Sequence, residues 1–99
     1  MSITFIGYSQ AKPETVDALR QFLLTVVLPA VRASEGNESC QMWQSQSDPT
    51  QFVVMEVWAS VEAHRASIQN ITRAEIDEYM TLVAAAPKGG YYDQVQASV

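Results

Sequence analysis

The stretch Gln51-Phe52-Val53-Val54-Met55-Glu56-Val57-Trp58 decides the fold of this chain. Its β-branched and aromatic side chains are typical of a β-strand, in which successive side chains point to opposite faces of the sheet. One face therefore carries Phe52, Val54, Glu56 and Trp58, and the other carries Val53, Met55 and Val57. An antiparallel strand with one solvated face alternates apolar and polar residues, and this stretch does not. We expect both faces of its sheet to be covered.

The length of the chain limits what that cover can be. Its 99 residues suffice for one domain, residues 1–99, with helices on one face of the sheet. A second copy of the same sheet is the simplest cover for the other face. The apolar stretch from Phe22 to Val31 and the hydrophobic fraction of 47% leave apolar surface to spare for such an interface. The sequence therefore predicts a homodimer.

Hydrophobic spacing and capping residues place the other elements around this strand. Ser60 is a suitable N-cap, Thr72 and Glu75 form a capping-box pattern, and Pro29 should kink the helix that contains it. The expected elements are a strand over 2–9, a helix over 13–31, strands over 38–46 and 51–58, a helix over 60–68, a helix from 72 that Pro87 and the glycines at 89 and 90 end, and a strand over 91–99. This order predicts a single α+β domain.

Composition argues against several classes of function. The net charge of −5, from six Lys and Arg against eleven Asp and Glu, disfavours binding to nucleic acid or to anionic membranes. The single cysteine, Cys40, allows no intramolecular disulfide and no multi-cysteine metal site, and we expect it to be a buried small residue of a strand. No apolar run reaches the roughly 20 residues that span a bilayer, and the N-terminus lacks a signal-peptide pattern. We expect a cytoplasmic protein.

Two titratable residues are candidates for chemistry. His64 is the only histidine, and it is either a structural residue or a pocket residue that transfers a proton or orients a substrate. Glu56 shares a face of the strand with Trp58, where a buried charge must be paired or hydrogen-bonded. It is either a structural carboxylate held by backbone groups or by an arginine at position 20, 32 or 65, or a base with a raised pKa.

Aromatic residues supply further candidates for a ligand site. Trp43 and Trp58 lie on neighbouring strands, and each either packs in the core or lines a pocket. Tyr79, on the last helix, supplies a hydroxyl group. No phosphate-cradling glycine loop, zinc pattern or dinucleotide fingerprint accompanies them. We therefore expect the protein to carry no tightly bound metal, flavin, haem or other cofactor.

The region from Glu35-Gly36 to Ile68 resembles the antibiotic-biosynthesis monooxygenase family. The matching features are an acidic-Gly turn after a long helix and the aromatic Trp43 on the next strand. A continuous run follows them, Asp48-Pro49-Thr50-Gln51-Phe52-Val53-Val54-Met55-Glu56-Val57-Trp58-Ala59-Ser60-Val61-Glu62-Ala63-His64. The order of elements agrees with the family over nearly the whole chain.

The resemblance implies a ferredoxin-like α+β domain with a four-stranded antiparallel sheet covered by helices, which packs on a second sheet to form a dimeric α/β barrel. It also implies a pocket between sheet and helices into which Trp58 projects. Cofactor-free members oxidise electron-rich aromatics such as anthrones, because deprotonating a phenol-like substrate raises its electron density enough to react with oxygen. By this resemblance His64 and Trp58 would be catalytic, and Trp43, Glu56 and Tyr79 would bind the substrate.

The chain departs from the family pattern at two places. Many members carry a histidine three residues beyond His64, where this chain has Ser67, and position 64 is usually apolar or aromatic. The haem-degrading branch uses an asparagine late in its first strand and a histidine about ten residues after the tryptophan, where this chain has Gly7-Tyr8 and Ile68. These residues disfavour haem degradation.

Two functions lead on the sequence, and other small-molecule chemistry on this scaffold, including isomerisation, stays open beside them. The first is a cofactor-independent monooxygenase that oxidises a small electron-rich aromatic, anthrone-like or quinol-like, with O2. The second is a non-catalytic dimeric module that binds a small ligand or acts in a stress response. A cavity on which polar groups converge favours the first function, and a wholly apolar cavity favours the second.

Overall fold

The structure is a computed structural model that describes residues 1–96. The strands are β1 (Ile3–Gln10), β2 (Asn37–Gln44), β3 (Gln51–Trp58) and β4 (Lys88–Tyr92). The helices are α1 (Val16–Phe22), α2 (Leu28–Arg32), α3 (Val61–Ser67) and α4 (Arg73–Leu82). Short helical segments extend or join them: η1 (Pro13–Thr15), η2 (Leu23–Val27) and η3 (Ile68–Asn70).

The four strands form one antiparallel sheet in the order β2-β3-β1-β4. The apolar strand β3 has the predicted bounds and lies between β2 and β1. It pairs with β1 from Ile3 opposite Trp58 to Gln10 opposite Gln51. The predicted fold class, an α+β ferredoxin-like domain with a four-stranded antiparallel sheet, is confirmed.

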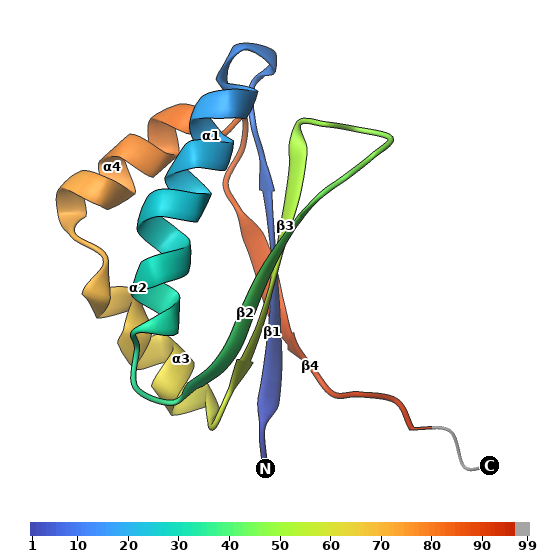
Figure 1. The fold of residues 1–99 in the computed structure, drawn as a ribbon, viewed down its shortest axis with the longest axis vertical. Coiled ribbons are helices and arrows are strands. Elements are labelled where there is room, and N and C mark those ends of the chain that lie inside the picture. The colour runs from blue at the N-terminus through green and yellow to red at the C-terminus, as the bar shows by residue number, and fades with distance from the viewer. Residues whose placement is uncertain (97–99) are drawn as a thin grey trace.

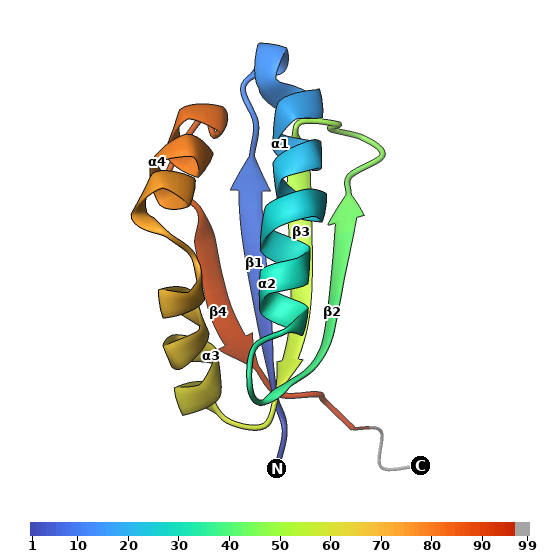
Figure 2. The ribbon, with the colours of Figure 1, turned by 60° about the vertical axis from the view of Figure 1, so that its left-hand side comes forward.

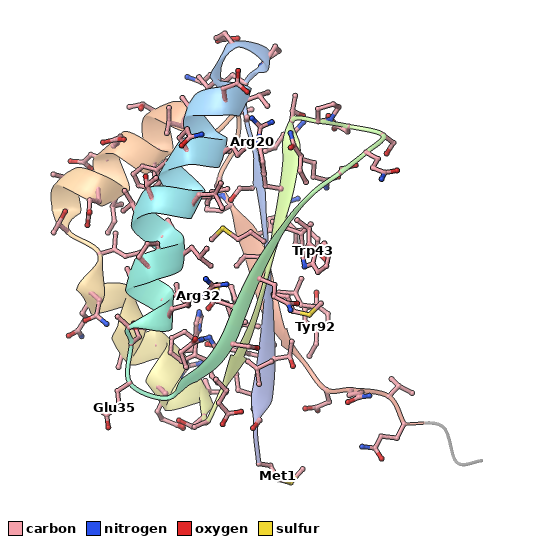
Figure 3. All side chains as sticks on the ribbon, in the orientation of Figure 1. Met1, Arg20, Arg32, Glu35, Trp43 and Tyr92 are labelled. Carbon is pink, nitrogen blue, oxygen red and sulfur yellow. The ribbon has the colours of Figure 1, made fainter. Side chains whose placement is uncertain are left out.

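All the helices lie on one face of the sheet (Figure 1). The continuous helix α1–η2–α2 crosses the middle of the sheet, and α3 and α4 lie on the side of β4 (Figure 2). The opposite face is bare, and Trp43 and Tyr92 project from it (Figure 3). Strand alternation places four exposed large side chains on this outer face: Tyr8, Trp43, Met55 and Tyr92. The helices thus cover only one of the two apolar faces of β3.

Two clusters of buried side chains fill the space between the sheet and the helices. The first consists of Ala11, Leu19, Leu23, Phe52 and Val83. The second joins Val31 of α2, Cys40 of β2 and Trp58 of β3. Cys40 is 2% exposed, as predicted for a buried small residue, and burial raises the pKa of its thiol to about 11. This thiol therefore contributes packing rather than reactivity.

The long helix is irregular just before Pro29, where the sequence predicts a kink. Segment η2 is a turn of π-helix, in which the N–H of Leu28 donates to the carbonyl of Leu23, five residues back. Pro29 has no N–H to donate to the carbonyl of Thr25, so the regular helical pattern cannot continue through this point. The predicted disturbance therefore takes the form of a widened turn.

The two predicted helix starts that frame the site are confirmed. The side chain of Ser60 accepts a hydrogen bond of 3.1 Å from the N–H of Ala63 at the start of α3. Thr72 and Glu75 form a complete capping box at the start of α4. Gly36, in the turn before β2, has a positive φ of 85°, and a Cβ there would lie 2.6 Å from Cβ of Ala63, so the turn packs closely on α3.

The last strand differs from the predicted strand over 91–99. β4 spans Lys88–Tyr92, residues 93–96 are not strand, and 97–99 lie outside the described residues. The glycines at 89 and 90 belong to this strand and do not end the helix, which stops at Leu82. A Cβ on Gly89 would lie 2.5 Å from Cζ of Phe5 on the neighbouring strand. Glycine at this position therefore makes room for an aromatic ring, rather than marking a turn.

Candidate functional site between the sheet and the helices

A buried carboxylic acid and an indole form the base of the site. Glu56 and Trp58 lie two residues apart on the inner face of β3, and their exposed fractions are 5% and 0%. The indole Nε1 of Trp58 donates a hydrogen bond of 2.8 Å to Oε1 of Glu56. This N–H is the only side-chain partner within hydrogen-bond distance that residues 1–96 give Glu56. Trp58 thus holds the carboxyl group in place from behind.

His64 of α3 faces this carboxyl group from the helical layer. Its Nε2 lies 3.9 Å from Oε1 of Glu56, and its Nδ1 shares a hydrogen bond of 2.7 Å with the hydroxyl of Tyr91. Its ring stacks on Phe5, with ring centroids 4.2 Å apart, and meets Trp58 edge to face at 5.5 Å. Elements far apart in the sequence (β1, β3, α3 and β4) therefore fix one imidazole ring.

Burial shifts the pKa values of Glu56 and His64 in the directions that favour their neutral forms. Desolvation raises the pKa of Glu56 above its usual 4.5, and the hydrogen bond from Trp58 offsets part of that rise. Desolvation also lowers the pKa of His64 below its usual 6.5, and the nearby charge of Arg65 adds to that effect. Both shifts disfavour a carboxylate–imidazolium ion pair. His64 is therefore neutral at neutral pH.

Two of the three arginines considered as partners for Glu56 are engaged elsewhere, and within residues 1–96 none of the three is hydrogen-bonded to its carboxyl group. The guanidinium group of Arg32 donates to the carbonyl of Cys40, and that of Arg20 donates to Asp17 and to Gln44. The carboxyl group is satisfied by an indole N–H on its own strand. Sequence alone could not choose this partner, because position i+2 on a strand shares a face but does not fix the rotamer.

A small cavity of about 100 Å³ opens onto the polar pair. Glu56 and His64 supply its titratable groups, and Ala30 of α2 and Ile68 supply apolar wall. The site thus combines a neutral imidazole and a buried carboxyl group with a space that a ligand atom could enter. Such a pair can accept and hold a proton.

A larger cavity of about 200 Å³ lies beside the small one, between α1, η2, α4 and the inner face of β1 and β3. Its walls are mainly apolar, with Phe22, Val54 and Ile76 among them. The hydroxyl of Tyr79 lies on its wall, hydrogen-bonded to the hydroxyl of Ser9, and Glu75 and Lys88 also border the cavity. Burial raises the pKa of Tyr79, so this hydroxyl stays protonated and acts as a hydrogen-bonding group.

The structure brings together some of the residues that the sequence singles out. Glu56, Trp58 and His64 form one cluster, and Tyr79 lines the neighbouring large cavity. Trp43 lies apart, since it is 56% exposed on the outer face and borders a shallow hollow beside α1 at the sheet edge. Trp58 is fully buried behind Glu56 and contacts it through the indole nitrogen.

Sequence reasoning did not identify the residues that orient His64. Tyr91 holds its Nδ1 and Phe5 stacks on its ring, although both sit in strands at the opposite ends of the chain. Phe5 and Tyr91 are opposite each other in the pairing of β1 with β4. Their shared contact with His64 could have been predicted only if the register of these two strands had been known.

Neither a metal-binding cluster nor a membrane-spanning helix is found among residues 1–96. Residues 1–96 contain no group of three or more His, Cys, Asp or Glu side chains placed to hold a metal ion. Within the same residues, no helix has both the length and the apolar character that crossing a membrane requires.

Fold and cavity together define a class of protein. This is a ferredoxin-like α+β domain whose fold matches that of dimeric α+β barrel structures, with a cavity of about 200 Å³ between its sheet and its helices. The sequence profile of the family described as "Antibiotic biosynthesis monooxygenase" matches residues 2–80. The chain belongs to this family.

Solved structures share this fold. The chain is similar to a putative antibiotic biosynthesis monooxygenase from Nitrosomonas europaea (23% identity, TM-score 0.80, covering 95% of this chain and 90% of the other). It is also similar to a putative antibiotic biosynthesis monooxygenase from Chloroflexus aurantiacus J-10-fl (25% identity, TM-score 0.74, 98% of each chain). SnoaB from Streptomyces nogalater, a cofactor-independent oxygenase studied as mutant N63A, shares the fold (11% identity, TM-score 0.79, 98% and 96%). No curated protein matches the sequence.

The shifted pKa of Glu56 predicts a pH dependence of stability. Folding raises this pKa above 4.5, so the folded state favours the protonated carboxyl group. The contribution of protonated Glu56 to the free energy of unfolding is therefore fully present below pH 4.5 and is lost as the pH rises through the folded-state pKa. Glu56→Gln cannot ionise but keeps an oxygen for Trp58. The free energy of unfolding of the wild type, minus that of Glu56→Gln, should therefore fall between pH 4.5 and neutrality.

Urea unfolding of both proteins across this range measures the difference. His64 titrates in both proteins, and its coupling to Glu56 is part of the measured difference. A difference that rises with pH would mean that the ionised carboxylate is the favoured form in the fold, contrary to the burial described above.

Proposed function

We propose that the protein is a cofactor-independent monooxygenase that oxidises a small electron-rich aromatic substrate with O2. The observation that carries the proposal is the imidazole of His64, fixed 3.9 Å from the buried carboxyl group of Glu56 in a cavity between sheet and helices. Family membership supports it, as does the fold shared with an oxygenase that needs no cofactor.

The proposed reaction needs no external reductant. A ring methylene flanked by aromatic rings loses two hydrogens and gains one oxygen atom, and the second atom of O2 leaves as water. The first step moves a proton from the substrate to Nε2 of His64, which leaves an electron-rich anion. The electrons of that anion then reduce O2, so the protein supplies positioning and a proton acceptor.

The neighbours of His64 have supporting roles in this proposal. Tyr91 holds Nδ1 and thereby selects the orientation in which Nε2 faces the cavity. Glu56 faces Nε2 at 3.9 Å, so its carboxyl group lies close to the charge that forms when the proton arrives. Trp58 is a positioning residue, since its indole N–H fixes the carboxyl group without facing the cavity. Tyr79 binds the substrate in the large cavity through its hydroxyl.

A non-catalytic binding module is the second candidate. The observation in its favour is the mainly apolar wall of the large cavity, whose Tyr79 hydroxyl is already bonded to Ser9. A ligand confined to that cavity would lie away from Glu56 and His64, and the protein would then bind it without oxidising it.

We also propose that two copies associate through the outer face of the sheet, with a partner sheet covering it. Met55 and Trp43 are 37% and 56% exposed there, although aromatic and sulfur-containing side chains are typical of buried interface cores. The helices lie on the other face and cannot cover them (Figure 1). The family fold is that of dimeric barrels, which supports the same assembly.

The assembly predicts a mass of about twice 11.0 kDa in sedimentation at micromolar concentration. Met55→Lys should shift the protein toward the monomer, because a lysine at the centre of the interface would lose its solvation on association. Met80→Lys is the matched control: Met80 is 49% exposed on α4, away from the outer face, and the dimer should persist. Monomeric wild-type protein would contradict the assembly.

The oxygenase activity predicts a dependence on the polar pair. With an anthrone or a quinol as substrate, His64→Ala should lower turnover about 10²–10⁴-fold, the usual cost of losing a proton-transfer group. Trp58→Phe should lower it less, because the carboxyl group remains but is no longer held. The rate of oxygen consumption with one aromatic substrate measures the turnover of both variants. Circular dichroism confirms that each variant folds.

Gln69→Ala, in the exposed end of the segment after α3, is the control and should keep wild-type turnover. Full activity in His64→Ala would remove His64 from the mechanism. Failure of the wild type to turn over any anthrone or quinol, with ligands still bound, would favour the binding module.

A further inference from the structure

The two ring nitrogens of His64 have different neighbours. Its Nδ1 shares a hydrogen bond of 2.7 Å with the hydroxyl of Tyr91 on β4. Its Nε2 lies 3.9 Å from Oε1 of Glu56, which is longer than a hydrogen bond between nitrogen and oxygen. Glu56 therefore does not fix which nitrogen carries the proton of the neutral ring. The hydrogen bond at Nδ1 is the contact that bears on the position of this proton.

The group that holds Nδ1 is a hydroxyl, not a carboxylate or a backbone carbonyl. Carboxylate and carbonyl oxygens only accept hydrogen bonds, so they keep the proton on the ring nitrogen that they contact. A tyrosine hydroxyl both donates and accepts. Tyr91 accepts from Nδ1 when that nitrogen is protonated, and it donates to Nδ1 when the proton is on Nε2. Both neutral tautomers of His64 thus keep a hydrogen bond at Nδ1.

Tyr91 also connects the imidazole to the surface of the protein. His64 is 9% exposed, with Phe5 stacked on its ring and Trp58 against its edge. Tyr91 is 40% exposed, because β4 is an edge strand of the sheet. Residues 1–96 give its hydroxyl one hydrogen bond, the bond to Nδ1. The rest of its hydrogen-bonding capacity is therefore available to water.

We propose that Tyr91 lets His64 exchange its two neutral tautomers, so that the same imidazole acts first as a base and then as an acid in one reaction cycle. Tyr91 is a positioning residue in this scheme, because it acts through His64 and does not touch the substrate. The sequence of base and acid rests on the proposed oxygenase function. The exchange of tautomers is a property of the resting protein and does not depend on that function.

The first half of the cycle removes one proton from the site. Nε2 accepts a proton from the ring methylene of the substrate, and the electron pair of the broken C–H bond stays on the substrate anion, which reduces O2. Nδ1 then passes its proton to the hydroxyl of Tyr91, and this hydroxyl releases its own proton to water. His64 is neutral again, with its proton on Nε2.

The second half of the cycle returns one proton to the site. Nε2 gives its proton to the oxygen atom that leaves as water, and the second hydrogen of the methylene completes that water molecule. Tyr91 donates a proton to Nδ1 and takes one from the solvent. One proton has left and one has returned, so both residues regain their initial state, and O2 is the only oxidant.

Nitrogen NMR of His64, the only histidine, distinguishes the tautomers at a pH above the midpoint of its titration. In the wild type, the chemical shifts of both ring nitrogens should lie between the protonated and the unprotonated values. Tyr91→Phe removes the hydroxyl but keeps the ring that packs against Phe5. A buried N–H without an acceptor is costly, so the proton should then stay on Nε2. The Nδ1 shift should move to the unprotonated value and the Nε2 shift to the protonated value.

Tyr92→Phe is the matched control, because it makes the same change at the next residue, on the outer face of the sheet. Both ring nitrogens of His64 should keep their wild-type shifts in this variant. A wild-type ring held in a single tautomer would overturn the proposal. Shifts that Tyr91→Phe leaves unchanged would overturn it as well.

Turnover separates this proposal from the proposed function. A ring whose Nε2 is already protonated cannot accept the proton of the substrate. Tyr91→Phe should therefore lower kcat about 10–100-fold, the usual cost of losing the group that holds the second nitrogen of a functional histidine, while KM stays close to the wild-type value. Wild-type kcat in Tyr91→Phe would overturn the cycle and leave the oxygenase function standing. A wild type without turnover would count against the oxygenase function alone, because the NMR experiment tests the tautomers without substrate.

Discussion

The burial of one carboxyl group constrains the whole inner layer of this protein. Glu56 lies on the central strand beneath the helices, where an unsatisfied charge would cost several kcal/mol, of the order that buried polar groups lose without partners. The indole N–H of Trp58 satisfies it, which requires Trp58 to be fully buried beside it. His64 then covers the pair from α3, and Glu56 and His64 both line the small cavity.

The same constraint links the ends of the chain to the site. His64 is held by Phe5 of β1 and Tyr91 of β4, strands that pair through Phe5 opposite Tyr91. Gly89 leaves space for the ring of Phe5, so an apparently structural glycine helps to set the position of the imidazole. The outer face exposes Tyr8, Trp43, Met55 and Tyr92, large side chains that suit a sheet that packs on a copy of itself.

The sequence predicts most of the fold, because local physics determines it. The two-faced strand β3, the cap at Ser60 and the capping box at Thr72 each depend on residues within one element, and the structure has all three. The predicted bounds of the last strand were wrong, because Gly89 and Gly90 were interpreted as residues that end the preceding helix. Their pairing with β1 depends on the long-range contact with Phe5. The candidate site was predicted only as separate residues: its hydrogen bonds join positions such as 64 and 91, whose proximity depends on the sheet order.

The central claim is that burial keeps the imidazole beside Glu56 neutral and able to accept a proton. Since His64 is the only histidine, an NMR titration of its ring signals reports this directly. The account predicts a midpoint below the usual 6.5, with the neutral ring present at neutral pH. A midpoint above 6.5 would mean that His64 and Glu56 form an ion pair in the resting protein, and that result would contradict the account.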